Sequence, residues 1–322
     1  MPPRVRIIPP APPAFQPFPV WARVRTPPEG PGEAGFLAGA SLAALHPIAR
    51  AEHPLASLWR QRLALSCAAA LAGQGGRTED EAALRDAWYL RRDGDDPGPA
   101  GRILSAWRRL GERAALRSEN WTFKLAAALE LRLDDGLKDV VSVAARLAKG
   151  EGSAVAAAAE IAAVSQRFRP DSDALALWLA DAVLAHRLNW PAPVPLLAGQ
   201  VLAGQLRRAD LRSASRHFDG DVHWLTVCCV AYANAAAAAA DLYAELARRA
   251  ERLLAVAPKL RGKDADLMVA SLLMEDAQAA KKGDETGKTA TDRSSRRLFE
   301  RLVGLGAVRE LTGRTTFRLY GL

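Results

Sequence analysis

The stretch from residue 34 to residue 256 is built from alanine and leucine at helical spacing, interrupted at short intervals by Gly, Pro and Asp. Apolar residues that recur every three to four positions predict amphipathic helices, and no run before the last fifteen residues alternates as a β-strand does. We therefore predict an all-α, multi-helix body over residues 33–258. The expected helices cover 34–50, 54–73, 78–90, 99–115, 121–133, 137–148, 153–167, a segment starting after Asp171 or Ser172, 196–208 and 222–256.

Local start signals support several of these helices. Thr78 and Glu81 have the spacing of a capping box, in which each side chain accepts a backbone N–H of the first turn. Pro99 suits the first turn of the next helix, because its missing N–H is not needed there. Trp107 is expected to anchor that helix in the core.

Residues 1–32 form a separate proline-rich arm. Residues 2–31 hold 11 of the 20 prolines, which excludes a regular helix and favours extended backbone. Phe15, Phe18 and Trp21 are too apolar for a solvated linker, so the arm is expected to lie along its own body or along a partner subunit. Packing on its own body is the favoured alternative.

Composition limits the class of protein. The 322 residues carry a net charge of +8, which fits contact with phosphates and equally fits the arginine-rich codons of a high-GC genome. Three cysteines, Cys67, Cys228 and Cys229, can build neither a disulfide framework nor a four-cysteine zinc site. The one long charge-free run, 222–240, is mostly alanine and too weakly apolar for lipid. We expect a cytoplasmic protein without a membrane partner.

The final segment is the one whose residues suggest a task. On a helix, Arg293, Arg297 and Arg301 share one face, while Leu298 and Leu302 share the opposite face. The helix is expected to end at Gly306, and 308–311 and 315–320 are expected to be strands joined by a turn at 312–314. A helix followed by a basic hairpin is typical of a winged-helix ending. We therefore predict a winged helix-turn-helix-like module over residues 259–322, which includes a helix at 264–280.

Charge supports a nucleic-acid role for this module. Residues 281–322 contain 10 basic and 5 acidic side chains, so more than half of the net charge of the chain lies in this segment. Arginines on a helix suit both phosphates and the base edges of the major groove, and an arginine on a hairpin tip suits the backbone. The expected partner is double-stranded DNA. The residues expected to contact it are Arg293, Ser294, Arg296, Arg297, Arg301, Arg314 and Arg318.

Other chemistry has weaker support. Two His and two Asp fall within 217–223, and three Asp surround Gly94, but neither spacing matches a known metal-ligand pattern, and both suit turns. No nucleophile elbow or phosphate loop is present in its required context, so we expect no catalytic residue, cofactor or metal. The alternative hypotheses are a helical interaction scaffold, in which the C-terminal module contacts a partner or a second copy as a homodimer, and, third, a metal-dependent enzyme.

Two resemblances accompany these predictions. The ending from Ser295 to Leu322 resembles winged helix-turn-helix tails of bacterial proteins, including those appended to Fic-type proteins. Over most of its length the chain resembles an uncharacterised alphaproteobacterial family, domain of unknown function 1403, through residues 84–88, 94–101, 258–261 and the terminal motif. This resemblance implies no activity. Because the family it points to occurs on chromosomes and plasmids, a regulator or accessory factor of a mobile element is the expected role. A winged helix also needs a helix before its recognition helix, for which 281–290 offers only a weak pattern.

Overall fold

The computed structural model describes residues 10–91, 94–112, 120–200, 213, 222–260, 265–279, 292–313 and 317–322, and the side chains of 292–294 are outside this description. The described chain is mainly helical, as the sequence predicts, and it has one small three-stranded sheet near the C-terminus where the sequence predicts a two-stranded hairpin. The helices of the body are α1 (Pro31–Arg50), α2 (Ala56–Gln74), α3 (Glu81–Tyr89), α4 (Gly98–Leu110), α5 (Trp121–Ala128), α6 (Asp135–Lys149), α7 (Ala154–Phe168), α8 (Asp173–Arg187) and α10 (Val222–Val256).

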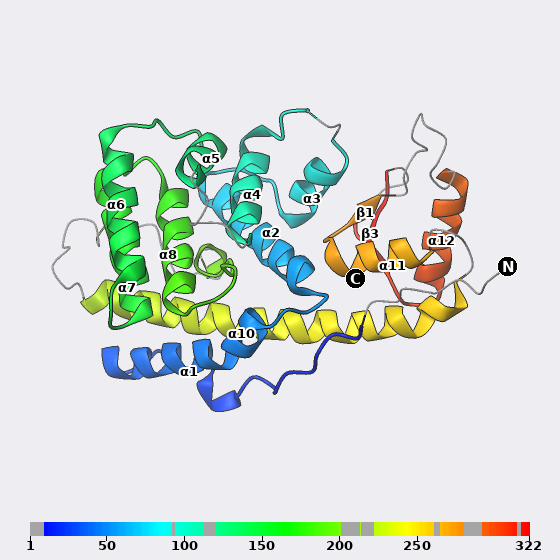
Figure 1. Ribbon diagram of the computed structural model, residues 1–322, viewed down its shortest axis with the longest axis horizontal. Helices are drawn as coiled ribbons and strands as arrows, with labels where there is room; N and C mark the ends of the chain where they lie inside the picture. Colours follow the sequence, from blue (N-terminus) through cyan, green and yellow to red (C-terminus); the bar gives the residue numbers. More distant parts are fainter. Residues whose placement is uncertain are drawn as a thin grey trace.

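Helix α10 is the axis of the molecule. Its 35 residues span about 50 Å at about 1.5 Å per residue. Figure 1 shows α1 along one side of α10, α2, α7 and α8 on the other side, and the C-terminal elements gathered at its far end. Helix α10 with the short η3 (Ala257–Lys259) is long and apolar enough to cross a membrane by length and composition, and 56% of its most apolar 18-residue window is buried inside the protein.

Buried alanines let the helices approach closely, and tryptophans fill the space between them. Trp59, Trp178 and Trp224 are buried, and each indole N–H donates to a backbone carbonyl of another helix, so these three rings enter the core without losing their hydrogen bonds. Trp107 is fully buried, which confirms its expected place in the core.

Helix starts follow the capping rules, with one correction. Ser172 caps α8 by accepting from the Leu175 N–H, which decides between the two expected capping residues. Helix α3 begins at Glu81 and is capped by Asp80, whose carboxylate accepts from the Ala83 N–H at 2.8 Å. The predicted Thr78 capping box is therefore wrong, because an aspartate nearer the helix takes the capping role.

Two helices end earlier than the sequence suggests. Helix α5 ends at Ala128, and the Leu131 N–H donates to the Ala126 carbonyl with Glu130 in the left-handed region at φ 55°. Helix α4 ends at Leu110 instead of near 115. At the expected helix 196–208 the chain forms a short 3-10 helix, η2 (Leu197–Gln200), and the remainder lies outside the described residues.

The described part of the arm lies on the body of its own chain. The Phe15 ring packs edge-on against Tyr243 of α10 with centroids 5.2 Å apart, and the Tyr243 hydroxyl donates to the Pro13 carbonyl. The arm then forms the 3-10 turn η1 (Val20–Ala22), whose Trp21 is 65% exposed. The arm therefore packs on its own body between Pro13 and Phe18, as the favoured alternative predicts, while Trp21 lies outside the core.

The C-terminal elements are α11 (Ala265–Met274), β1 (Gln278–Ala279), α12 (Asp292–Gly304), β2 (Arg309–Glu310) and β3 (Leu319–Gly321). The strands form an antiparallel sheet in the order β1-β3-β2, in which Gln278 pairs with Tyr320 and Arg309 pairs with Gly321. The prediction of one helix across 264–280 is wrong at its end, because the chain leaves the helix after Met274 and adds a third strand.

Candidate nucleic-acid interface

Helix α12 has one buried side and one exposed side. Ser295, Phe299 and Leu302 are buried, and the Phe299 ring stacks on Tyr320 of β3 with centroids 4.3 Å apart. These contacts fix the helix against the sheet. The exposed polar residues among the described side chains of the helix are Arg296, Arg297, Glu300 and Arg301, of which three are cationic, and Val303 near the end of the helix is also exposed.

The end of α12 is fixed by its glycine. The Gly306 N–H donates to the Val303 carbonyl, and the Ala307 N–H donates to the Leu302 carbonyl, with Gly306 at φ 66°. This is the Schellman arrangement, in which a left-handed residue satisfies the last carbonyls of a helix. The predicted helix stop at Gly306 is confirmed. The chain then turns directly into β2.

The hairpin that follows carries charge and one exposed ring. The Leu311 N–H donates to the Leu319 carbonyl at 2.8 Å, and Gly313 adopts φ 61° at the turn. Arg318 lies 3.5 Å from Glu310 across the hairpin. Phe317 is 75% exposed and also has a positive φ, of 55°.

The sequence-predicted DNA contacts fall into four groups. Arg296 and Arg297 are exposed on α12. Arg301 is exposed and donates to the Lys259 carbonyl at 3.2 Å, so it also ties α12 to the end of α10. Arg318 is exposed and belongs to the Glu310 ion pair. The side chains of Arg293 and Ser294, and all of Arg314, lie outside the described residues.

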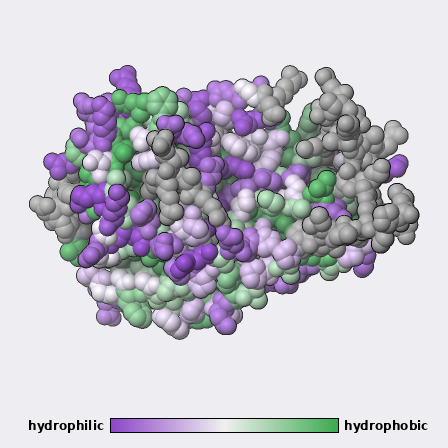
Figure 2. Space-filling model, viewed as in Figure 1, coloured by the Kyte–Doolittle hydropathy of each residue, from purple (hydrophilic) through white to green (hydrophobic). Residues whose placement is uncertain are grey.

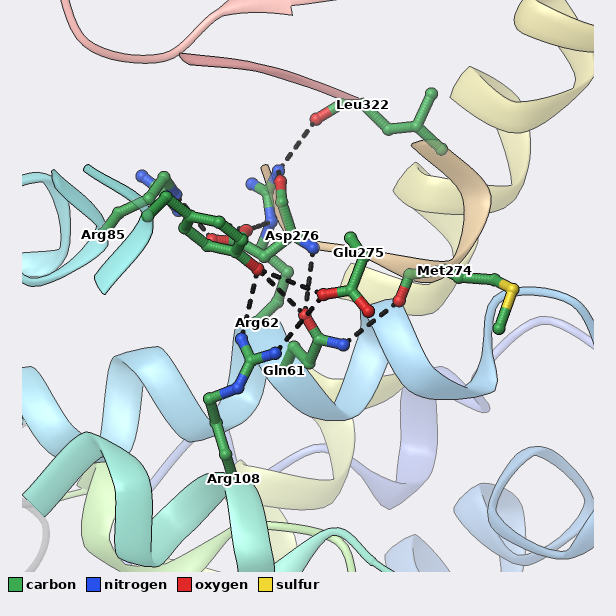
Figure 3. Close-up of polar contacts among 9 residues, drawn as sticks. Gln61, Arg62, Arg85, Arg108, Met274, Glu275, Asp276 and Leu322 are labelled. Carbon is green, nitrogen blue, oxygen red and sulfur yellow. Dashed lines mark hydrogen bonds and ion pairs between the residues drawn. The ribbon is translucent and has the colours of Figure 1, made fainter. Parts of the chain in front are cut away.

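A buried ion cluster that sequence analysis did not predict joins this C-terminal module to the body. Asp276, which follows α11, is 2% exposed and forms ion pairs with Arg62 of α2 and with Arg85 of α3. The Arg85 Nε lies 2.7 Å from the Asp276 carboxylate. Figure 3 shows both arginines converging on Asp276 from the body side. Three charges buried together are stabilised only while all of them are paired. We name Arg62, Arg85 and Asp276 the docking cluster.

Neighbouring contacts extend the docking cluster. Arg62 also donates to the carbonyls of Asp276 and Leu322, so the last residue of the chain is held against α2. A Cβ on Gly321 would lie 2.6 Å from the Asp276 carbonyl oxygen, so only glycine fits there without a shift. Arg108 of α4 pairs with Glu275 at 3.3 Å. The sheet and the body therefore meet through a closely fitted seam.

Arginines are crowded at one edge of this seam. Arg309 lies on the edge strand β2. Partial burial lowers the pKa of its guanidinium group, and the positive charges of Arg249, Arg62 and Arg85 lower that pKa further. Burial also lowers the pKa of Arg62, although the Asp276 carboxylate opposes that shift. Arg309 of the module therefore lies close enough to arginines of the body to be influenced by their charge.

The other polar clusters act as turns where the structure describes them. Asp96 accepts from the Gly98 N–H and pairs with Arg102 at 2.7 Å, and both contacts lower its pKa. Asp93, His217, Asp219 and Asp221 lie outside the described residues, and His223 is exposed on α10. Within the described part of the chain, no group of three or more His, Cys, Asp or Glu side chains is placed to hold a metal ion.

Comparison with known proteins identifies the family alone. The family described as protein of unknown function DUF1403 matches residues 13–322, which is nearly the whole chain, so the chain belongs to this family. No curated protein matches the sequence significantly.

Proposed function

We propose that the protein binds duplex DNA through a winged-helix module at its C-terminus, with α12 facing the major groove and the β2–β3 hairpin as the wing. The observation that carries this proposal is the division of α12. Its apolar side is fixed on the sheet, and its arginine side faces outward. A rigidly held helix with outward arginines meets the requirement for reading a groove, because register and orientation are set before contact.

The order of elements supports the same proposal. A winged helix runs helix, strand, two helices and two strands, and its first strand pairs with its last. Here α11 precedes β1, α12 precedes β2 and β3, and the sheet order is β1-β3-β2. The position of the second helix corresponds to residues 280–291, which lie outside the described residues. The first strand, absent from the sequence-based expectation, is an added point of agreement with this fold.

The proposed roles differ between residues. Arg296 and Arg297 contact phosphates and base edges, because they occupy the outward face of α12. Arg301 is a phosphate contact that also braces α12 against the Lys259 carbonyl. Arg318, paired with Glu310, contributes at the wing. In the cell this activity suits a regulator or accessory factor of a plasmid or other mobile element.

A mobility-shift titration over a range of salt concentrations tests the proposal. The wild-type protein is expected to bind duplex DNA with a linear dependence of log affinity on log salt, with a slope of about −0.9 per phosphate contacted. The double variant Arg296→Ala and Arg297→Ala is expected to weaken binding and to make the slope shallower by about 1 to 2. Absence of wild-type binding at low salt overturns the proposal.

A matched control separates site from net charge. The variant Lys149→Ala and Arg167→Ala removes two exposed cations from α6 and α7, at the end of the molecule opposite α12 (Figure 1). It has the same net charge as the Arg296 and Arg297 variant. Equal loss of binding in both variants contradicts a localised interface. Retention of a protein partner by a chain that binds no DNA favours the interaction-scaffold alternative.

A further inference from the structure

The outer side of α1 is an uncharged surface that no described element covers. Leu37, Leu45 and Ile48 on its inner side are buried. Its outer side carries exposed residues, and the sequence between Glu33 and Arg50 contains no Asp, Glu, Lys or Arg. We name this outer side the α1 face; its exposed residues are Gly32, Gly35, Phe36, Gly39, Ala43 and Pro47.

Large aromatic side chains extend the α1 face toward the arm. Phe36 is 62% exposed and Trp21 is 65% exposed, and their rings lie 5.9 Å apart. Val20, beside Trp21, is 58% exposed. Figure 2 shows pale and green residues predominating along the lower edge of the molecule, where Figure 1 places α1. A contiguous apolar surface of this kind on a folded protein usually marks an interface.

The charges at the two ends of the α1 face indicate which partner covers it. Glu33 lies in the first turn of α1 and Arg50 in the last turn, so the two ends have opposite charge. A second α1 laid antiparallel on the first therefore places Glu33 beside Arg50 of the second copy, twice by symmetry. The helix dipoles are also opposed favourably in this arrangement. A face that is complementary to itself is what a two-fold symmetric dimer requires.

The register that pairs Glu33 with Arg50 also brings small and apolar residues of the two copies together. Phe36 meets Pro47 of the second copy, and Gly39, Ala40 and Ala43 meet at the centre. A Cβ added at Gly39 would find no atom within 4 Å in the single chain, so packing within one copy does not explain a glycine there. Glycine in an exposed helix costs about 1 kcal/mol relative to alanine, and close approach of a second helix accounts for its presence.

We propose that the protein forms a two-fold symmetric homodimer in which the α1 faces of two copies pack antiparallel, with Trp21 and Phe36 at the two ends of the contact. This proposal is independent of DNA binding. The dimer leaves α12 outside the interface, because α1 and α12 lie at different ends of α10 (Figure 1).

A charge exchange tests the proposal most directly. Sedimentation equilibrium of the full chain at micromolar concentrations is expected to give twice the chain mass of 34.5 kDa. Glu33→Arg alone and Arg50→Glu alone are each expected to weaken the dimer about tenfold or more, since each places two like-charge pairs in the contact. The double variant restores opposite charges and is expected to regain the dimer. Circular dichroism confirms that each variant remains helical.

A packing pair gives a second, separate test. Gly39→Leu is expected to yield a folded monomer, because its side chain points into open space in one chain but into the centre of the dimer. Gly304→Leu on α12 is the matched control, since a Cβ there also meets nothing within 4 Å, and it is expected to remain dimeric. A monomeric wild type, or a Gly39→Leu variant as dimeric as the control, overturns the proposal.

Discussion

The helical body and the C-terminal module are held together by different interactions. In the body, α7, α8 and α10 meet through buried alanines, Ser153 and Ser172 cap α7 and α8, and Trp224 of α10 donates to a backbone carbonyl of α7. The module is joined to that body through the docking cluster, where two arginines from α2 and α3 close on one aspartate after α11. Apolar packing tolerates small changes, whereas a buried ion cluster loses much of its stability when one member is removed.

The first prediction breaks the docking cluster. Asp276→Ala leaves the Arg62 and Arg85 guanidinium groups buried and unpaired, so the free energy of unfolding is expected to fall by about 3–5 kcal/mol. Urea unfolding measures this change. Glu275→Ala is the control: its side chain is 37% exposed, so it is expected to cost about 1 kcal/mol or less. Equal losses in the two variants would contradict a docking role specific to Asp276.

The second prediction concerns Asp181, a buried acid of the body that has no cation beside it among the described residues. Asp181 is fully buried and accepts the Leu196 and Leu197 N–H groups, and burial raises its pKa to about 7. Between about pH 4 and pH 7 the folded state therefore holds a proton that the unfolded state releases. The stability that Asp181 contributes is present below about pH 4 and is lost as the pH rises toward 7, by up to about 4 kcal/mol.

Asp181→Asn removes that titration and keeps an oxygen acceptor for the two N–H groups. Urea unfolding of both proteins at a series of pH values is expected to show the variant gaining stability relative to the wild type as the pH rises. A difference between them that does not vary with pH would show that Asp181 has an ordinary pKa. Comparison of this variant with Asp276→Ala shows how the stability contributed by an acid paired with arginines differs from that of an acid held by backbone amides.

The third prediction tests the fit of the seam. Gly321→Ala forces a methyl group against the Asp276 carbonyl, so β3 or Asp276 must shift, at a cost of about 1–3 kcal/mol. Because the shift is local, hydrogen exchange is expected to accelerate in β1 and β3 and to remain unchanged in α7 and α8. Gly304→Ala is the control, since a Cβ there meets nothing within 4 Å. Faster exchange throughout the body would show that the seam is not a separate unit.

The same contrast explains what the sequence could predict. The helices of the body have a period of three to four residues and end at Gly, Pro or Asp, so local signals placed α1, α2, α6, α7, α8 and α10 within a few residues. The Schellman stop at Gly306 was equally local. Strand β1 was missed because two residues carry no periodicity, and its partner β3 lies about forty positions later. The docking cluster was missed because nothing in the sequence links residues 62, 85 and 276 before the chain folds.

The candidate interface shows the same limit. The amphipathic pattern of α12 predicted its two sides, and Arg296 and Arg297 lie on the exposed one. The contact between Arg301 and the Lys259 carbonyl could not be predicted in this way, because it depends on where the chain runs after α10. Long-range charge pairing in the module, and helix-end contacts between distant segments, are therefore the features that only the structure supplies.

The smallest expected effect tests a local signal that the structure reassigned. Asp80 caps α3 by accepting from the Ala83 N–H, so Asp80→Ala is expected to cost about 1 kcal/mol, as loss of a helix cap usually does. Thr78→Ala is expected to change stability by a few tenths of a kcal/mol at most, because Thr78 precedes the cap. Urea unfolding of the two variants measures both effects. A larger loss for Thr78→Ala would restore the capping box, and it would show that α3, which carries Arg85 to the docking cluster, begins two residues earlier.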